Sequence, residues 1–142
     1  MRNLLKWKIC KSMKKNKIGV VCAIIEIENK TLVVQRSESM KLPLKWEFPG
    51  GKIEPNESEE DCIKREIREE LNIEIILLKR LKPTYYEYPN IAIELIPFLA
   101  NHLSGDMELR EHRQYKLLKK GELSSLDWAD ADLPIIEELQ RI

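Results

Sequence analysis

Residues 51–73 read GKIEPNESEEDCIKREIREELNI, and their pattern decides the fold. A glycine-containing loop is followed by Ser58, whose hydroxyl can cap the first turn of a helix. Ile63, Ile67 and Leu71 then recur every four residues, which is the spacing of one buried helix face. The segment therefore predicts an ordered loop that leads into an amphipathic helix.

Three glutamates of this helix form a candidate metal site. Glu66, Glu69 and Glu70 are spaced i, i+3 and i+4, so their carboxylates lie on one side of the helix, and Glu57 lies one turn before it. Like charges at this spacing destabilise a helix unless a cation neutralises them. Oxygen ligands suit Mg²⁺ or Mn²⁺ better than zinc. A solvated acidic helix face is the alternative interpretation of these residues taken alone.

The loop before the helix favours the metal interpretation. Gly50 and Gly51 allow the backbone to approach a metal or a phosphate closely, and Lys52 offers a positive charge beside them. A simple turn explains the two glycines. A simple turn does not explain why Lys52 lies in the loop that leads to a cluster of carboxylates.

This combination resembles the signature of the Nudix hydrolase family. Eight signature positions match within 23 residues: Gly51, Glu57, Arg65, Glu66, Ile67, Glu69, Glu70 and Ile73. The one departure is Asn72, where the family has glycine. Asparagine is the residue after glycine that best tolerates a positive φ, so the departure is compatible with the fold.

The resemblance implies an α+β fold, an α/β/α sandwich with a mixed sheet between helices, and an enzyme that depends on Mg²⁺ or Mn²⁺. It assigns metal binding to the Gly50 carbonyl and three helix carboxylates, and catalytic roles to five side chains: Glu57, Arg65, Glu66, Glu69 and Glu70. Arg65 is expected to pair with Glu57 as a planar fork. One glutamate of the helix, or one from residues 108–111, is expected to activate water.

The flanking segments complete a mixed layout of strands and helices. A β-hairpin is predicted from two apolar segments, a polar loop and a Gly/Pro-rich ordered loop come before the helix, and further strands, a charged loop and a final helix follow it. The hairpin covers residues 18–28 and 31–36, the polar loop 37–46 and the Gly/Pro-rich loop 47–56. The strands after the helix are 73–81, 84–88, 91–100 and 113–118. The charged loop is 101–111, and the final helix is 133–141.

The flanks are similar to the MutT-type branch, which converts nucleoside triphosphates into a monophosphate and pyrophosphate. By that resemblance Arg36 contacts the nucleotide, Asp132 reads the base edge, and Gly51 and Lys52 bind substrate. From sequence alone, an exposed strand-end arginine and a helix N-cap are the alternatives for Arg36 and Asp132. An ionised aspartate accepts hydrogen bonds, which favours CTP, dCTP or oxidised nucleotides such as 8-oxo-dGTP and a role in nucleotide-pool sanitation.

Other aromatic and histidine residues receive structural interpretations. Phe48 and Trp128 are candidates for stacking on a base, although Phe48 is equally suited to a core. Tyr85, Tyr86 and Tyr88 are interpreted as strand tyrosines. Residue 112, a histidine, is interpreted as structural or solvated because no nucleophile pattern accompanies it.

Two alternative functions stay open on the sequence alone. One is a Nudix hydrolase of another nucleoside diphosphate derivative, such as a sugar nucleotide or a dinucleoside polyphosphate. The other is a non-catalytic, nucleotide-sensing Nudix domain. Retention of all four signature glutamates argues against the second alternative.

Composition restricts the class of protein. Residues 1–17 carry seven basic and no acidic residues, so the 24 basic and 24 acidic residues of the chain leave 17 basic and 24 acidic ones in residues 18–142, a balance of −7. We interpret residues 1–17 as a solvated basic extension and residues 18–142 as the Nudix domain. An acidic body does not fit nucleic-acid binding, and no membrane segment is predicted. Three scattered cysteines indicate reduced thiols in a cytoplasmic protein. The expected partner is a nucleotide substrate, and the chain is expected to be a monomer or a homodimer.

Overall fold

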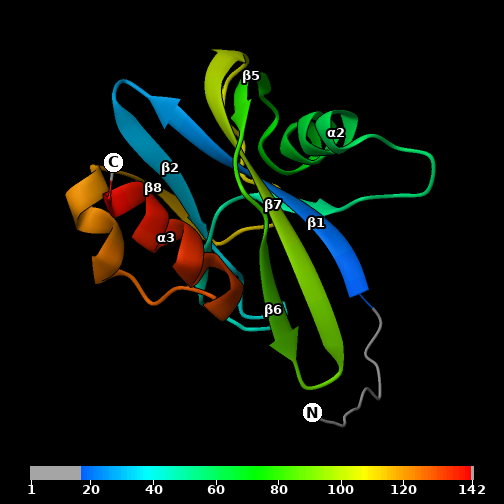
Figure 1. The fold of residues 1–142 in the computed structure, drawn as a ribbon. Helices are drawn as coiled ribbons and strands as arrows, with labels where there is room; N and C mark the ends of the chain where they lie inside the picture. The colour runs from blue at the N-terminus through cyan, green and yellow to red at the C-terminus, as the bar shows by residue number, and fades with distance from the viewer. Residues whose placement is uncertain (1–16, 142) are drawn as a thin grey trace, which may run out of the picture.

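The computed structural model describes residues 17–141, which form one mixed β-sheet with helices packed on it (Figure 1). The strands are β1 (Lys17–Ile27), β2 (Lys30–Gln35), β3 (Trp46–Glu47), β4 (Gly50–Lys52), β5 (Glu74–Arg80), β6 (Thr84–Tyr88), β7 (Ile91–Ser104) and β8 (Gln114–Leu118). The helices are α2 (Glu59–Leu71), α3 (Leu133–Gln140) and the 3₁₀ helices η1 (Lys120–Ser125) and η2 (Asp130–Asp132).

Strand β1 is the centre of the sheet. It pairs in parallel with β7 over ten residues and antiparallel with β2 and β4. The main path of the sheet runs β3-β2-β1-β7-β5, while β6 joins β7 and β8 joins β2. One parallel pair among antiparallel ones makes the sheet mixed, as expected.

Alternate residues of β1 point into two separate cores, because side chains of a strand alternate between its faces. Val21, Ala23 and Ile25 pack in the core that contains the apolar face of α2. Cys22 and Ile24 pack in the second core, which contains the buried residues of α3. The sheet therefore lies between helices, as the α/β/α sandwich requires.

Helix α2 begins and ends where the sequence predicts. The Ser58 hydroxyl accepts a hydrogen bond from the Asp61 N–H at 3.0 Å. At the other end, Asn72 has φ 61° and its N–H donates to the Arg68 carbonyl at 3.0 Å. Its Nδ2 also donates to the Asp106 carbonyl, so the asparagine ties the helix end to a distant loop.

Two segments predicted to lack regular structure contain strands. Within residues 47–56, Gly50–Lys52 forms β4, and Glu47 belongs to β3; both strands are short and form by pairing with β1 and β2. Residues 101–104, assigned to a charged loop, continue β7 because Glu74 of β5 pairs with Ser104. In each case a distant partner strand supplies the hydrogen bonds, which a local pattern does not record.

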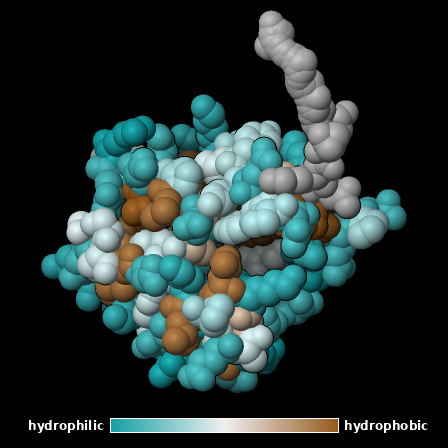
Figure 2. All heavy atoms as spheres, turned by 90° about the horizontal axis from the view of Figure 1, so that it is seen from below, coloured by the Kyte–Doolittle hydropathy of each residue, from teal (hydrophilic) through white to brown (hydrophobic). Residues whose placement is uncertain are grey.

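Lys17, assigned to the basic extension, is the first residue of β1 and pairs with Ala92. The rest of the predicted extension, residues 1–16, lies outside the described residues. None of the helices in the described part of the chain has the length and apolar character needed to cross a membrane. The surface seen from below is mostly hydrophilic, with hydrophobic residues in separate small groups (Figure 2).

Candidate active site

A cavity of about 630 Å³ lies where α2, β4, the β6–β7 hairpin and η2 meet. Glu66 and Glu70 of α2 line one part of it together with Gly50, Gly51 and Lys52. Phe48, Ala131 and Asp132 also line it, as do Arg36 and the hairpin residues 88–91. Its volume is in the range of small-molecule sites. The cavity thus brings together residues that are far apart in the sequence.

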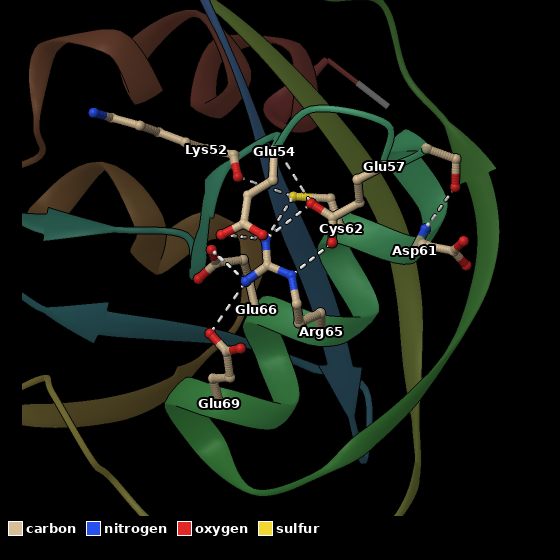
Figure 3. Close-up of polar contacts among 9 residues, drawn as sticks. Lys52, Glu54, Glu57, Asp61, Cys62, Arg65, Glu66 and Glu69 are labelled. Carbon is tan, nitrogen blue, oxygen red and sulfur yellow. Dashed lines mark hydrogen bonds and ion pairs between the residues drawn. The ribbon is translucent and has the colours of Figure 1, made fainter.

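Arg65 holds the acidic cluster together from the side of the helix (Figure 3). Its Nε donates to Glu57 Oε2 at 2.6 Å and its Nη2 to Glu57 Oε1 at 2.9 Å, so the expected planar fork is present. The hydrogen bonds from Arg65 lower the pKa of Glu57 to about 2. Nη1 of the same guanidinium lies 3.2 Å from both Glu66 Oε2 and Glu69 Oε1.

The three helix glutamates are not equivalent. Glu70 is buried and Glu66 is largely buried, and both line the cavity, whereas the Glu69 side chain is 56% exposed and does not line it. Burial raises the pKa of both cavity carboxyls, and at Glu70 the charges of Glu47, Glu66 and Glu111 raise it further. The neighbouring charges and the burial thus both disfavour the ionised form of these carboxyls.

The backbone of the loop is pressed against this pair. A Cβ atom on Gly51 would overlap the Glu66 carboxylate, and one on Gly50 would overlap the Val21 carbonyl. Only glycine allows such close approach at both positions. Gly51 therefore places backbone at the Glu66 carboxylate, while Gly50 packs against the backbone of β1.

The donors fit a hard divalent cation. Within residues 17–141, no three acidic, histidine or cysteine side chains already converge as a complete ligand set. The carboxylates of Glu66 and Glu69 instead accept hydrogen bonds from Arg65. The available donors are nevertheless oxygens, and the buried Glu70 Oε1 has no hydrogen-bond partner among the described residues. An oxygen that is buried and unpaired is suited to a cation.

Of the two glutamates in residues 108–111, one lines the cavity and the other does not. Glu111 lines the cavity, and its charge acts on Glu70. Glu108 instead lies 3.4 Å from Arg110. The Arg110 N–H donates to the Glu70 carbonyl at 3.1 Å, so this loop is fixed to the end of α2.

A buried network that the sequence did not reveal holds Arg36. Glu47 accepts from Arg36 Nη1 at 2.8 Å through one oxygen and contacts His112 Nε2 at 2.8 Å through the other. The Arg36 side chain is 19% exposed, so it is not an exposed strand-end arginine. His112 is buried rather than solvated. The local signal was the position of Glu47 next to the glycine loop, because β3 forms by pairing with segments that are distant in the sequence.

Asp132 occupies the N-cap position of α3 but makes no side-chain capping bond. Its Oδ2 accepts from the Phe48 N–H at 2.9 Å, and its side chain lines the cavity. Burial raises the pKa of Asp132 to about 8, with Glu47 adding to the rise and the Phe48 N–H and Arg36 opposing it. This raised pKa favours the protonated carboxyl at neutral pH, whereas the interpretation from the sequence took the aspartate as ionised.

Phe48 and Trp128, the two residues proposed to stack on a base, differ in whether they line the cavity. The rings of Phe48 and Trp128 are 5.0 Å apart between centroids, and both side chains are nearly fully buried. Phe48 lines the cavity and Trp128 does not. Trp128 donates its Nε1–H to the Leu123 carbonyl and belongs to the second core.

The sequence of this chain matches one known protein family. A model of the NUDIX domain family aligns with residues 15–139 of this chain. This chain belongs to the Nudix family. The match spans the cavity residues from Arg36 to Asp132, so the Nudix domain includes the whole candidate site.

Two enzymes of Escherichia coli are similar to this Nudix chain. The CTP pyrophosphohydrolase is 34% identical over 120 residues, which cover 84% of this chain and 89% of that protein. The 8-oxo-dGTP diphosphatase is 31% identical over 131 residues, which cover 92% of this chain and 100% of that protein. With the family match, these relatives make the chain a hydrolase of phosphoric anhydrides.

Solved Nudix structures share the fold. The MutT protein of Methanosarcina mazei superposes with a TM-score of 0.83 at 26% identity and covers 92% of this chain and 97% of its own. A MutT protein of the Nudix hydrolase family from methicillin-resistant Staphylococcus aureus has a TM-score of 0.72 at 42% identity, covering 88% and 96%. The predicted sandwich is confirmed.

Proposed function

We propose that this Nudix hydrolase converts nucleoside triphosphates into a monophosphate and pyrophosphate with Mg²⁺ or Mn²⁺, acting on CTP-like or oxidised nucleotides such as 8-oxo-dGTP. One observation carries the proposal: a single cavity contains both the paired carboxylates of α2 and the buried carboxyl of Asp132. The first group suits a metal-bound phosphate chain, and the second suits a base edge. A role in removing damaged nucleotides follows from such a substrate.

At the phosphate end, Glu66, Glu70 and the Gly50 carbonyl would hold the cation, and Glu69 would join them after release from Arg65. Bound Mg²⁺ or Mn²⁺ supplies the positive charge that polarises phosphoryl oxygens and acidifies a water molecule. Arg65 keeps the cluster oriented through its fork on Glu57. Lys52 lines the same region and can pair with phosphate oxygens.

The proposed reaction is an in-line displacement at phosphorus. The water oxygen forms a new P–O bond while the anhydride P–O bond breaks, and pyrophosphate leaves. A carboxylate of α2 or of Glu111 takes the water proton. Arg36 would contact the nucleotide, held in place by Glu47.

A protonated Asp132 suits both proposed base classes. It can donate through its hydroxyl and accept through its other oxygen. Cytosine offers an acceptor at N3 beside an amino donor, and 8-oxoguanine offers an acceptor at O6 beside an N7–H donor. Each base edge therefore complements a neutral carboxyl with two hydrogen bonds.

A substrate panel with Mg²⁺ tests this function. CTP, dCTP, UTP, dGTP, 8-oxo-dGTP, a sugar nucleotide and a dinucleoside polyphosphate would be incubated separately with the full chain, and the products separated by anion exchange. We expect pyrophosphate release, fastest from CTP-like substrates or 8-oxo-dGTP. Turnover confined to the diphosphate-linked compounds would overturn the proposal.

A further inference from the structure

Residues 127–132, here called the base-side segment, carry Asp132 along one edge of the cavity. On one side the segment is bound to β3 through its backbone. The Trp46 N–H donates to the Asp127 carbonyl and the Ala129 N–H donates to the Trp46 carbonyl, each at 2.9 Å. These bonds fix the first half of the segment and leave the half that contains η2 to other contacts.

Two tyrosine hydroxyls of β6 hold that second half. The Tyr86 hydroxyl donates to Asp130 Oδ2 at 3.0 Å. The Tyr88 hydroxyl accepts from the Ala131 N–H at 3.3 Å. Both bonds reach η2 across more than 40 residues of sequence, and they hold the two residues just before Asp132.

The two rings form one rigid unit. Residues two apart on a strand share a face, and the rings of Tyr86 and Tyr88 meet edge to face with centroids 4.6 Å apart. Both pack against the second core. Tyr85 points to the other face, where its hydroxyl donates to Glu94 Oε2 at 2.9 Å. It is therefore a matched tyrosine whose hydroxyl bonds elsewhere than η2.

Asp132 is held by the contacts of η2, to which the tyrosine hydroxyls add. Its N–H donates to the Ala129 carbonyl at 3.0 Å, and Ala131 packs in the second core. The 3₁₀ helix η2 is three residues long, and such short helices rely on tertiary contacts for stability. Asp132 makes no capping bond, so its carboxyl is placed by the η2 backbone and by the Phe48 N–H.

We propose that Tyr86 and Tyr88 are positioning residues that set base selectivity by fixing η2 and thereby the Asp132 carboxyl. The inference rests on the proposed function, because it takes the Asp132 end of the cavity as the base site. Neither tyrosine hydroxyl is assigned contact with the reacting phosphate. Tyr88 also lines the cavity, so its substitution acts on the bound base directly as well as through Asp132. We expect loss of the two hydroxyls to alter discrimination between bases more than the rate of the chemical step.

The test compares Tyr86→Phe, Tyr88→Phe and the double variant with Tyr85→Phe as the control. For each protein, kcat and KM would be measured for the best substrate of the panel and for dGTP, whose O6 and N7 are both acceptors. We expect the ratio of the two kcat/KM values to fall about tenfold in the double variant, the size of one to two hydrogen bonds. KM for the best substrate should rise by a larger factor than kcat falls, and Tyr85→Phe should resemble the parent in both.

Two further measurements separate a positioning role from a purely structural one. In an Asp132→Ala background Tyr86→Phe should cause no additional loss of selectivity, because its effect passes through Asp132. Hydrogen exchange at the Ala131 amide should accelerate in Tyr88→Phe, which reports the contact without any substrate.

Each negative result has a distinct meaning. An unchanged selectivity ratio in the double variant, or unchanged exchange at Ala131, would overturn the positioning role while wild-type turnover still supported the proposed function. A parallel fall of kcat for both nucleotides would show a general loss of structure and would also overturn it. Failure of the wild-type chain to hydrolyse any triphosphate would reject the proposed function and this inference together.

Discussion

Glu70 places a carboxyl group where water is largely excluded, with three other carboxylates acting on it. A buried, unpaired carboxylate is costly in a folded protein unless it is protonated or meets a cation. Arg65 donates hydrogen bonds to Glu57 and, within the helix, to Glu66 and Glu69. It has no such bond to Glu70 in the described part of the chain. At the scale of single residues, the site is therefore left with one acidic group that a cation can satisfy.

The substitution Glu70→Gln tests this interpretation. The amide has nearly the same shape but no charge, so we expect kcat with Mg²⁺ to fall by about 100-fold or more, since metal activation contributes several kcal/mol. Without metal, the free energy of unfolding should be unchanged or higher, because a costly buried acid has been removed. Steady-state kinetics and urea denaturation in EDTA measure the two effects.

The matched control is Glu60→Gln, which removes an exposed carboxylate from the first turn of the same helix. It should leave kcat close to that of the parent. Equal turnover in Glu70→Gln and the parent would show that the metal site lies elsewhere.

The short strand β4 is the element that joins the loop to the sheet. It pairs with β1 through Val20, Val21 and Cys22, and this pairing brings the glycine loop to the carboxylates of α2. The strand is too short to form alone, so its position depends on the close approach of Gly50 to β1. The three residues of β4 therefore connect the central strand β1 to the carboxylates of the candidate active site.

Gly50→Ala should impair stability and turnover together, because one close contact supports both. The new Cβ would collide with the Val21 carbonyl, and overpacking of this kind costs about 1–3 kcal/mol. We expect a lower unfolding midpoint in urea and a loss of turnover. Gly121→Ala is the control, since its Cβ would meet no atom within 4 Å. If the two variants unfolded at the same urea concentration, the close packing of β4 on β1 would not be a constraint on the fold.

At the scale of the whole molecule, Glu57 and Asp132 make the free energy of unfolding depend on pH with opposite signs. Glu57, whose pKa is lowered to about 2, stabilises the fold above its ordinary value of 4.5, and this contribution is lost as the pH falls toward 2. Asp132 has the reverse effect. The unfolded chain releases its proton near 3.8, but the folded chain retains it until about pH 8. The free energy of unfolding therefore falls as the pH rises across that window.

Asp132→Asn should remove this second dependence. The amide oxygen can still accept from the Phe48 N–H, so the contact is preserved. We expect the variant to gain stability relative to the parent as the pH rises from about 4 to about 8, with the difference constant above that range. Urea denaturation at pH 4 to 9 measures it. The exposed Asp106→Asn provides the reference curve, and a parallel course of all three curves would contradict the raised pKa.

Most of helix α2 could be predicted from local pattern. The cap at Ser58, the buried stripe and the left-handed Asn72 involve residues a few positions apart, where spacing along a helix dictates contact. The fork between Arg65 and Glu57, eight residues apart, was expected from the family resemblance. The fold class followed from the same signature through its family resemblance. The boundaries of β3, β4 and the end of β7 did not, because each depends on a partner strand remote in sequence.

The sequence by itself determined which residue types meet on α2, and hence the family and the class of reaction. Only the tertiary structure decided that Glu70 is buried while Glu69 is exposed, that Glu47 and His112 contact each other at the site, and that burial raises the pKa of Asp132. The physical reason is that desolvation and long-range hydrogen bonds act on a side chain through whatever packs around it. Those neighbours come from other strands, and their identity is fixed when the sheet assembles.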